Sequence, residues 1–404
     1  MLRGKRGVRL SVWPSNGLFV GQPGFFFAKR TIELSPQQAC RQATRRLVVV
    51  VPRQAQSRLA AEKFNVFGFS RVVAMRKKLY RFFASRTFSL TEFDDPVTCF
   101  WSKGFGRHCD VRGPEHYWRA PTESVQDEEF FRQHYGAAHG LVWVRLSTQP
   151  RDGRPADLDR FVAGALPSIN RPFVLVTSDG DICVPSELRA DTVAALLSNP
   201  WLMAWYTQNH DGQGGPKLHP LPIGLDLHTP RPFTNPRRLL ADLAQIRSAR
   251  PPLASQPLRV FCDIGLSLAS PQRISAIQAL KGCAHIDIIR RRVSQRAIWQ
   301  RYASYPFVLS LEGNAVDCHR TWEALYLGAI VITKSSAIDP LFAGLPVVIV
   351  QDWAEILDEN NLQRWYQRYA PLTEQNTLWR QLDASAFMAG LRQHLTPLEA
   401  PDGQ

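Results

Sequence analysis

Apolar and polar positions along residues 139–228 predict strands that alternate with helices. Short apolar runs of strand length are each followed by a polar loop and then by a segment with helical spacing. The predicted strands are Gly140–Leu146, Pro172–Thr177, Trp201–Thr207 and Leu221–Gly224, and the predicted helices are Ala156–Ala165 and Ser186–Leu197. This alternation is typical of a parallel sheet covered on both faces, so we expect an N-terminal α/β domain over residues 46–228.

The same alternation restarts after residues 229–257, which are rich in proline and arginine and hold one predicted helix, Pro236–Ser248. We expect this stretch to be a linker. The predicted strands beyond it are Leu258–Ile264, His285–Ile289, Pro306–Leu311, Ala329–Thr333 and Pro346–Val350. The predicted helices are Pro271–Leu280, Ser294–Ala303, His319–Leu327 and two more that start at Trp353 and Thr373. Residues 258–404 are therefore expected to form a second, Rossmann-like domain.

Charge is concentrated at the N-terminus. Residues 1–91 carry 18 Lys and Arg and two acidic residues, a net charge of +16, whereas the rest of the chain carries −2. Residues 1–45 lack sustained periodicity and are expected to be disordered, with a targeting segment or a mis-set start as alternatives. Residues 71–86 predict a basic amphipathic helix, which either rests on an anionic membrane or packs on its own domain with a solvated basic face.

Cysteine usage and hydropathy indicate a cytoplasmic protein. The seven Cys are scattered and no C-x-x-C pair occurs, which argues against a disulfide framework or a zinc site. No apolar run reaches the length of a transmembrane helix, and no secretory signal pattern follows the basic start. Peripheral contact with a membrane surface remains open through residues 71–86.

The stretch FVLSLEGNAVDCHRTWEALYLG, residues 307–328, contains the most informative pattern. An apolar strand ends at Gly313 and Asn314, and the loop runs into a helix. Its first turn would present free backbone N–H groups at the carboxyl end of a strand, where α/β sheets bind ligands. Arg320 in that turn is suited to a diphosphate, and Glu323, one turn on, to ribose hydroxyls. Asp317 and His319 are further candidates, with turn capping as their alternative role, and Trp322 is expected to pack.

Residues 307–353 resemble the exostosin-like family of glycosyltransferases. The resemblance rests on the Gly313 loop, Arg320, Glu323-Ala324-Leu325, Leu327-Gly328 and Asp352-Trp353, in this order along the chain. It is softer over residues 258–375 and faint before them. It implies a GT-B-like α/β fold, with two Rossmann-like domains whose parallel sheets face a central cleft. It also implies a nucleotide-diphosphate sugar donor, usually a UDP-sugar, and inversion at the anomeric carbon.

A second phosphate contact is predicted at the start of Pro271–Leu280. Ser270 can cap this helix, and Arg273 would project from its first turn towards the same cleft, although a solvated arginine is the alternative. Lys334, just after a predicted strand, lies at the same edge. Many retaining GT-B enzymes carry a second glutamate eight positions before the one at the ribose, and here that position is Ala315, which favours inversion.

An inverting transfer needs a general base from the acceptor side. Asp179 and Asp181 end a predicted strand of the first domain and are the candidates, with His210, Asp211 and Asp226 as rivals. Asp179-Gly180-Asp181 also fits the short D-x-D pattern that holds a metal in GT-A enzymes. Since arginines and a helix dipole can neutralise a leaving diphosphate, we expect no cofactor and no essential metal.

Three functions compete on these observations. The first is a glycosyltransferase acting on a glycan or lipid-linked glycan acceptor, which the sequence does not identify. The second is a non-catalytic protein that binds nucleotide sugars or glycans. A nucleic-acid binder acting through residues 1–91 is the third, and it is disfavoured because no reading module accompanies the charge.

Overall fold

A computed structural model describes residues 8–11, 31–34, 78–90, 98–122, 124–147, 155–263, 271–289, 291 and 293–396. The chain forms two units, Met1–Met75 and Arg76–Gln404. In the first unit, β1 (Val8–Ser11) pairs antiparallel with β2 (Thr31–Leu34). The expected disorder of residues 1–45 otherwise falls outside the described residues. Everything below concerns the second unit.

The first sheet of the second unit is parallel throughout, in the order β3-β4-β5-β6. Its strands are β3 (Gly140–Arg145), β4 (Phe173–Ser178), β5 (Leu202–Gln208) and β6 (Leu218–Leu221). The helices of this part are α3 (Glu115–Arg119), α4 (Glu128–Tyr135), α5 (Asp157–Gly164) and α6 (Ala190–Ser198). Strand β4 is buried along its whole length, which fits its apolar start at Phe173–Val176; the hydroxyls of Thr177 and Ser178 are buried at its end.

The second sheet is also parallel, in the order β11-β10-β9-β7-β8. Its strands are β7 (Val260–Cys262), β8 (Ile286–Ile288), β9 (Phe307–Leu309), β10 (Ile330–Lys334) and β11 (Val347–Val350). Because β8 lies on one side of β7 and β9 on the other, the direction of winding reverses between β7 and β9. This reversal is the switch point at which open α/β sheets bind ligands.

Seven α-helices follow the first sheet among the described residues. They are α7 (Pro236–Ser248), α8 (Pro271–Leu280), α9 (Gln295–Ser304), α10 (His319–Tyr326), α11 (Glu359–Tyr369), α12 (Gln375–Gln381) and α13 (Ala384–Leu391). Short 3-10 turns are η2 (Gly104–His108), η3 (Leu166–Ser168), η4 (Leu253–Ser255), η6 (Asp339–Phe342), η7 (Trp353–Leu357), η8 (Ala370–Thr373) and η9 (Arg392–Leu395). Among the described residues, no helix is both long and apolar enough to span a bilayer.

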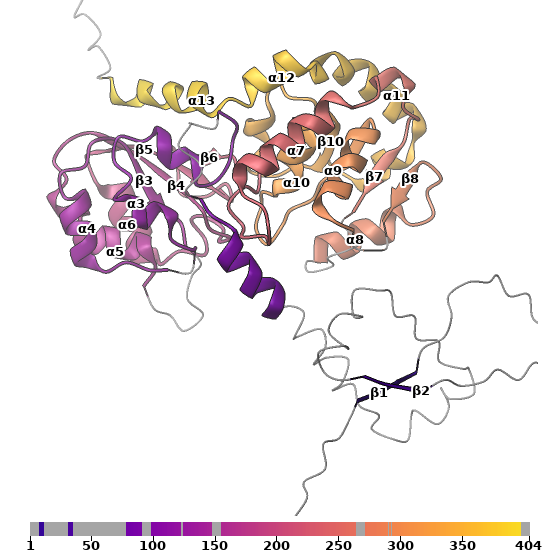
Figure 1. The fold of residues 1–404 in the computed structure, drawn as a ribbon. Coiled ribbons are helices and arrows are strands. Elements are labelled where there is room, and N and C mark those ends of the chain that lie inside the picture. The colour runs from indigo at the N-terminus through magenta and orange to yellow at the C-terminus, as the bar shows by residue number, and fades with distance from the viewer. Residues whose placement is uncertain are drawn as a thin grey trace, which may run out of the picture. The chain divides into compact units, whose positions relative to one another are not determined.

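The last helices return to the first sheet. In Figure 1, α13 lies beside the first sheet and away from α8 and β8. Nε2 of His394 lies 3.0 Å from the Tyr206 hydroxyl of β5, and Arg392 forms an ion pair of 2.8 Å with Asp110. The segment assigned by sequence to the second domain therefore also completes the surface of the first.

Three predicted elements differ from the structure. The helix expected from Trp353 is a 3-10 turn, η7, and α11 begins at Glu359. The strand expected over Leu221–Gly224 lies earlier, at β6, because Gly224 adopts a left-handed φ of 69° and leaves the sheet. The helix expected from Ser186 begins at Ala190, because residues 183–188 form turns, with the Leu188 N–H bonded to the Pro185 carbonyl. Of the basic helix expected over residues 71–86, residues 78–87 are helical, and the earlier part lies outside the described residues.

The α/β architecture that the sequence predicts is confirmed. Two parallel sheets, of four and five strands, make up the described part of the second unit, and a cavity lies between their carboxyl edges. Apolar residues of both sheets and of the helices between them belong to one continuous core, which holds the two halves together. This is the GT-B-like arrangement.

Candidate functional site

A cavity of about 860 Å³ lies where the two sheets face each other. Its lining includes the loops that follow β4, β5 and β9, three strands of the two parallel sheets. A volume of this size is at the upper end of ordinary ligand pockets. Seven of the residues that the sequence proposes for the site line it: Asp179, Asp181, Arg273, Gly313, Asn314, Asp317 and His319.

Asp179 is held firmly on the first side of the cavity. Its carboxylate is buried, with Oδ2 2.5 Å from the Lys103 ammonium and Oδ1 accepting from the Thr122 hydroxyl. Against the effect of burial, the charge of Lys103 lowers the pKa of Asp179. An aspartate that is buried, paired and ionised is a poor acceptor for a substrate proton, so Asp179 is better suited to positioning its neighbours.

Asp181 differs from Asp179 in its surroundings. It is exposed, it lines the cavity, and its Oδ2 accepts a hydrogen bond of 3.1 Å from Nδ2 of Asn314. Among the described residues, no lysine or arginine forms an ion pair with Asp181. Two of its rivals, His210 and Asp211, cap the turn around Gln213 and do not line the cavity.

The start of α10 forms the second side. Oδ2 of Asp317 accepts from the Ile223 N–H of the first half at 2.8 Å, and both of its oxygens accept from Nε1 of Trp322. Burial raises the pKa of Asp317 to about 6. The contact joins the loop after β6 to the start of α10. The N-cap of this helix is Cys318, without a side-chain capping bond, so Asp317 does not cap α10. Trp322 packs as expected.

The loop before α10 is tightly built. The Gly313 N–H bonds to the Ala315 carbonyl, and a side chain at Gly313 would approach the Asp317 carbonyl to 3.2 Å. His319 lies at the first position of α10, and its Nδ1 is 2.7 Å from the Gly224 carbonyl. Since a carbonyl only accepts, Nδ1 carries the proton and Nε2 keeps its lone pair.

Two arginines lie at the switch point of the second sheet. Arg320 forms an ion pair with Asp263, which directly follows β7, and Asp263 also accepts from the Tyr302 hydroxyl at 2.9 Å. Arg273 of α8 lines the cavity and donates from Nε to the Glu312 carbonyl at 2.8 Å. Burial, and next the positive charge of Arg320, lower the pKa of Arg273. Arg273 provides charge-assisted donors at the cavity wall, and Arg320 lies behind it in an ion pair with Asp263, an arrangement that suits binding of an anion.

Three proposed donor ligands do not line the cavity among the described residues. Arg320 is turned to Asp263, as above. Glu323 is buried between α9 and α10, where it accepts from Nε2 of Gln295 at 3.2 Å, and burial raises its pKa to about 7. Lys334 ends β10 with its ammonium 5.8 Å from the Trp353 ring. The roles assigned to these residues remain predictions.

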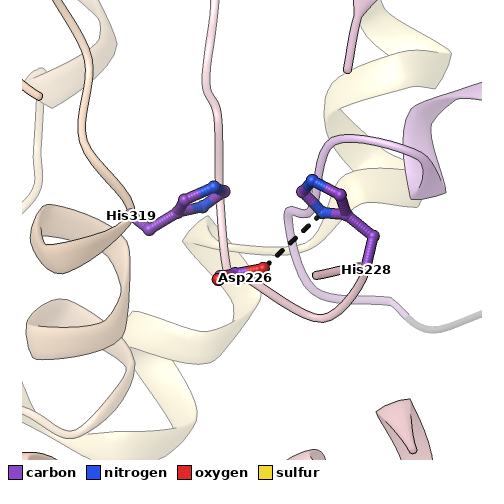
Figure 2. Close-up of side chains that lie close together, drawn as sticks. All are labelled: Asp226, His228 and His319. Atoms are coloured by element: carbon purple, nitrogen blue, oxygen red, sulfur yellow. Dashed lines mark ion pairs between the residues drawn. The ribbon is translucent and has the colours of Figure 1, made fainter. Parts of the chain in front are cut away.

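Asp226, His228 and His319 form a cluster that the sequence analysis does not assemble (Figure 2). Nδ1 of His228 lies 3.9 Å from Oδ1 of Asp226, and the two imidazole rings are 5.7 Å apart. Burial lowers the pKa of His228, so this ring is neutral at neutral pH. Against burial, Arg231 holds the pKa of Asp226 below its usual range.

Lys103 and His228 are functional candidates that sequence reasoning missed. Lys103 is buried and donates to Asp179 and to the carbonyls of Trp118 and Ala120. It lies in a segment without helical or strand periodicity, so no pattern marks it. His228 follows Asp226 by two positions, a spacing that could have marked the pair as a group.

Comparisons with known proteins give a weak likeness among solved structures. No protein family matches the chain, and no curated protein matches it. Among solved structures, the chain is similar to one from Anabaena, a crystal structure of HepE in complex with UDP and glucose. The TM-score is 0.34 and the identity 15%, over 64% of this chain and 78% of the other. The function of this chain therefore has to be argued from the residues of its site.

Proposed function

We propose that this protein is a glycosyltransferase that uses a nucleoside diphosphate sugar, a UDP-sugar, as donor. The observation that carries the proposal is the pair Arg273 and Arg320 at the switch point of the second sheet, next to a cavity bounded by both sheets. A diphosphate in the cavity would accept charge-assisted hydrogen bonds from Arg273 and would compete with Asp263 for Arg320. The N-terminus of α10 adds a positive dipole end at the same place.

The remaining donor contacts are proposed from the sequence pattern, since Glu323 and Lys334 do not line the cavity in the part of the chain that the structure describes. The loop at Gly313 and Asn314 allows close approach of the donor, and Glu323 takes the ribose hydroxyls. Lys334 provides a further positive charge at the same edge of the second sheet. The pattern from Gly313 to Leu327-Gly328 is the reason to place the enzyme with exostosin-like glycosyltransferases, in a domain organisation of 46–228 and 258–404 joined by 229–257.

Transfer with inversion requires a base opposite the donor, on the side of the first sheet. Asp181 is the candidate, because it is exposed to the cavity from that side, whereas the carboxylate of Asp179 is buried in an ion pair with Lys103. It would take the proton from an acceptor hydroxyl of a glycan or lipid-linked glycan as that oxygen attacks the anomeric carbon. The bond to the nucleoside diphosphate breaks with its electron pair, and the arginines stabilise the departing anion.

Peripheral contact with an anionic membrane is a separate part of the proposal. The helix at residues 78–87 exposes Leu79, Tyr80, Phe82 and Phe83, and the Arg86 guanidinium lies 4.0 Å from the centre of the Phe82 ring. Aromatic side chains next to basic ones suit the interface of an anionic bilayer. Phe82→Ser should co-sediment less with phosphatidylserine vesicles than wild type does. Equal co-sedimentation of the variant and wild type would refute the proposed membrane contact.

Calorimetry with UDP tests the donor site. Wild type should bind UDP, and Arg320→Ala should weaken binding by about 10–100-fold, the effect of losing a charge-assisted hydrogen bond. Because Arg320→Ala leaves Asp263 buried without its partner, Arg320→Lys and a circular dichroism spectrum accompany it. Arg296→Ala, which removes an ion pair with Asp242 on the outer helices, is the matched control. Absence of UDP binding to folded wild type at millimolar concentration would refute the donor assignment.

A further inference from the structure

The cluster of Asp226, His228 and His319 joins two distant parts of the chain. Asp226 and His228 lie in the loop that follows β6, and His319 opens α10 of the second half (Figure 2). One ligand atom from each residue lies within 4.8 Å of the others. His228 and His319 line the cavity, so the cluster is open to the ligand that the cavity receives.

Both imidazole rings are oriented by a group behind them. The proton of His319 is fixed on Nδ1 by the Gly224 carbonyl, at 2.7 Å. That carbonyl depends on the left-handed conformation of Gly224, where a side chain would approach the Phe100 carbonyl to 2.2 Å. Metal-binding histidines are commonly oriented in this way, by a carbonyl or carboxylate at the second ring nitrogen.

His228 shows the same arrangement with a carboxylate. Its Nε2 lies 3.5 Å from Oδ1 of Asp179, nearer than Nδ1 lies to Asp226, and we therefore assign the proton to Nε2 and the lone pair to Nδ1. Nδ1 is buried and has no hydrogen-bond partner among the described residues. A buried acceptor without a partner is costly, and here it faces Asp226.

Asp226 retains capacity for one more partner on the side of the histidines. Its Oδ2 is paired with Arg231 at 2.5 Å, and its Oδ1 accepts from the Thr229 N–H at 3.1 Å. A carboxylate oxygen has two lone pairs, so Oδ1 has one left, and this oxygen is 3.9 Å from Nδ1 of His228. Arg231 and Thr229 hold the carboxylate in place.

We propose that Asp226, His228 and His319 bind a single divalent metal ion of the zinc class, through Oδ1, Nδ1 and Nε2. Two imidazoles and one carboxylate suit Zn²⁺ or Co²⁺ and disfavour Mg²⁺ and Ca²⁺, which prefer oxygen ligands alone. Three protein ligands leave a fourth position, which faces the cavity. This inference does not rest on the proposed function, and it runs against the expectation of no essential metal.

The separations in the cluster fit an empty site. Ligand bonds of about 2 Å place the corners of a tetrahedron roughly 3.3 Å apart. The observed separations are 3.9 Å between His228 and Asp226 and at most 4.8 Å within the group. Small side-chain rotations bring the three atoms to a common ion, without displacement of β6 or α10.

Calorimetric titration of the tag-free, chelator-treated full chain with Zn²⁺, in the absence of nucleotide, tests the site. One ion should bind per chain, and Co²⁺ should produce the visible absorption of a tetrahedral ion. His228→Ala and His319→Ala should each weaken Zn²⁺ binding by about 100-fold or more, in line with loss of a direct ligand. His134→Ala, an exposed histidine on α4, is the control and should bind as wild type.

Asp226→Asn keeps the shape of the side chain and serves if a histidine variant does not fold. It should lose Zn²⁺ binding while its circular dichroism spectrum is unchanged. Failure of wild type to bind Zn²⁺, or equal binding by all variants, would overturn the proposal. UDP binding measured in chelator reports on the donor site alone, so failure of the metal site and failure of the proposed function give different results.

Discussion

Nδ2 of Asn314 donates a hydrogen bond of 3.1 Å to Oδ2 of Asp181, so the loop after β9 touches the loop after β4 across the cavity. The two residues come from different sheets. Asp181 therefore lies where the two sides of the cavity meet. A ligand bound on the side of the second sheet would come close to its carboxylate. This contact is the structural basis for the first prediction.

Asp181→Asn should abolish most turnover while it preserves donor binding. Asparagine can keep the contact with Asn314 but cannot accept a proton, and loss of a general base lowers kcat by about 10²–10⁴-fold. The dissociation constant for UDP should change by less than about threefold. Asp191→Asn, an exposed residue on α6, is the control. Unchanged turnover would exclude Asp181 as the base.

Arg273→Gln should weaken UDP binding by about 10–100-fold, because a charge-assisted partner of the diphosphate is lost. The same change removes the repulsion with Arg320 but also the hydrogen bond to the Glu312 carbonyl, so thermal stability without nucleotide should change little. Calorimetry and a thermal melt measure the two effects. Arg259→Gln, whose ion pair with Asp287 lies away from the cavity, should leave UDP binding unchanged. A loss of thermal stability with unchanged affinity for UDP would show that Arg273 has a structural role and does not bind the diphosphate.

Local pattern predicts much of this fold. Apolar runs of strand length locate β3, β4, β5 and β9 within a few residues, and α7 and α8 begin and end where their prolines and caps predict. The Gly313 loop and the start of α10 are equally local, since a strand, a glycine and a helix start follow one another along the chain. These features depend on near neighbours, which a sequence displays directly.

Contacts between residues far apart in the sequence cannot be predicted from local pattern. Lys103 meets Asp179 across 76 positions, and Arg320 meets Asp263 across 57, yet each pairing decides whether a charge faces the cavity. Helical spacing puts Arg320 and Glu323 on one face but does not show what that face packs against. The cluster of Asp226, His228 and His319 likewise depends on how the two halves are joined.

Glu323 should make stability depend on pH in a defined direction. Burial raises its folded-state pKa to about 7 from 4.5, so folding favours the protonated form. This contribution is fully present below pH 4.5 and is lost as pH rises through 7, a change of about 3 kcal/mol. Glu323→Gln cannot titrate, so wild type should lose stability relative to this variant over that window.

Urea unfolding of both proteins from pH 4 to pH 8, followed by tryptophan fluorescence, measures this difference. Asp317 titrates in both proteins and cancels in the comparison. Glu129→Gln, an exposed residue on α4, is the control and should follow wild type throughout. A constant difference between wild type and Glu323→Gln would show that Glu323 is ionised when folded.

Arg145 and Asp157 should dominate the stability of the first half. Both side chains are fully buried and form an ion pair of 2.7 Å, and Arg145 also donates to the carbonyls of Ala120, Pro121 and Ser124. Asp157→Ala leaves a buried guanidinium without its counter-charge, which costs about 3–5 kcal/mol. Urea unfolding measures the loss.

The same variant should also disturb the cavity. Arg145 and Lys103 both hold the Ala120 carbonyl, and Lys103 positions Asp179, so a loosened segment at residues 117–122 changes that wall. Arg160→Met breaks an ion pair with Glu128 that is a third or more exposed and should cost under about 1 kcal/mol with no effect on turnover. Equal costs for Asp157→Ala and Arg160→Met would show that burial adds nothing to the Arg145 pair. A larger cost for Asp157→Ala with unchanged turnover would confine Arg145 to a structural role.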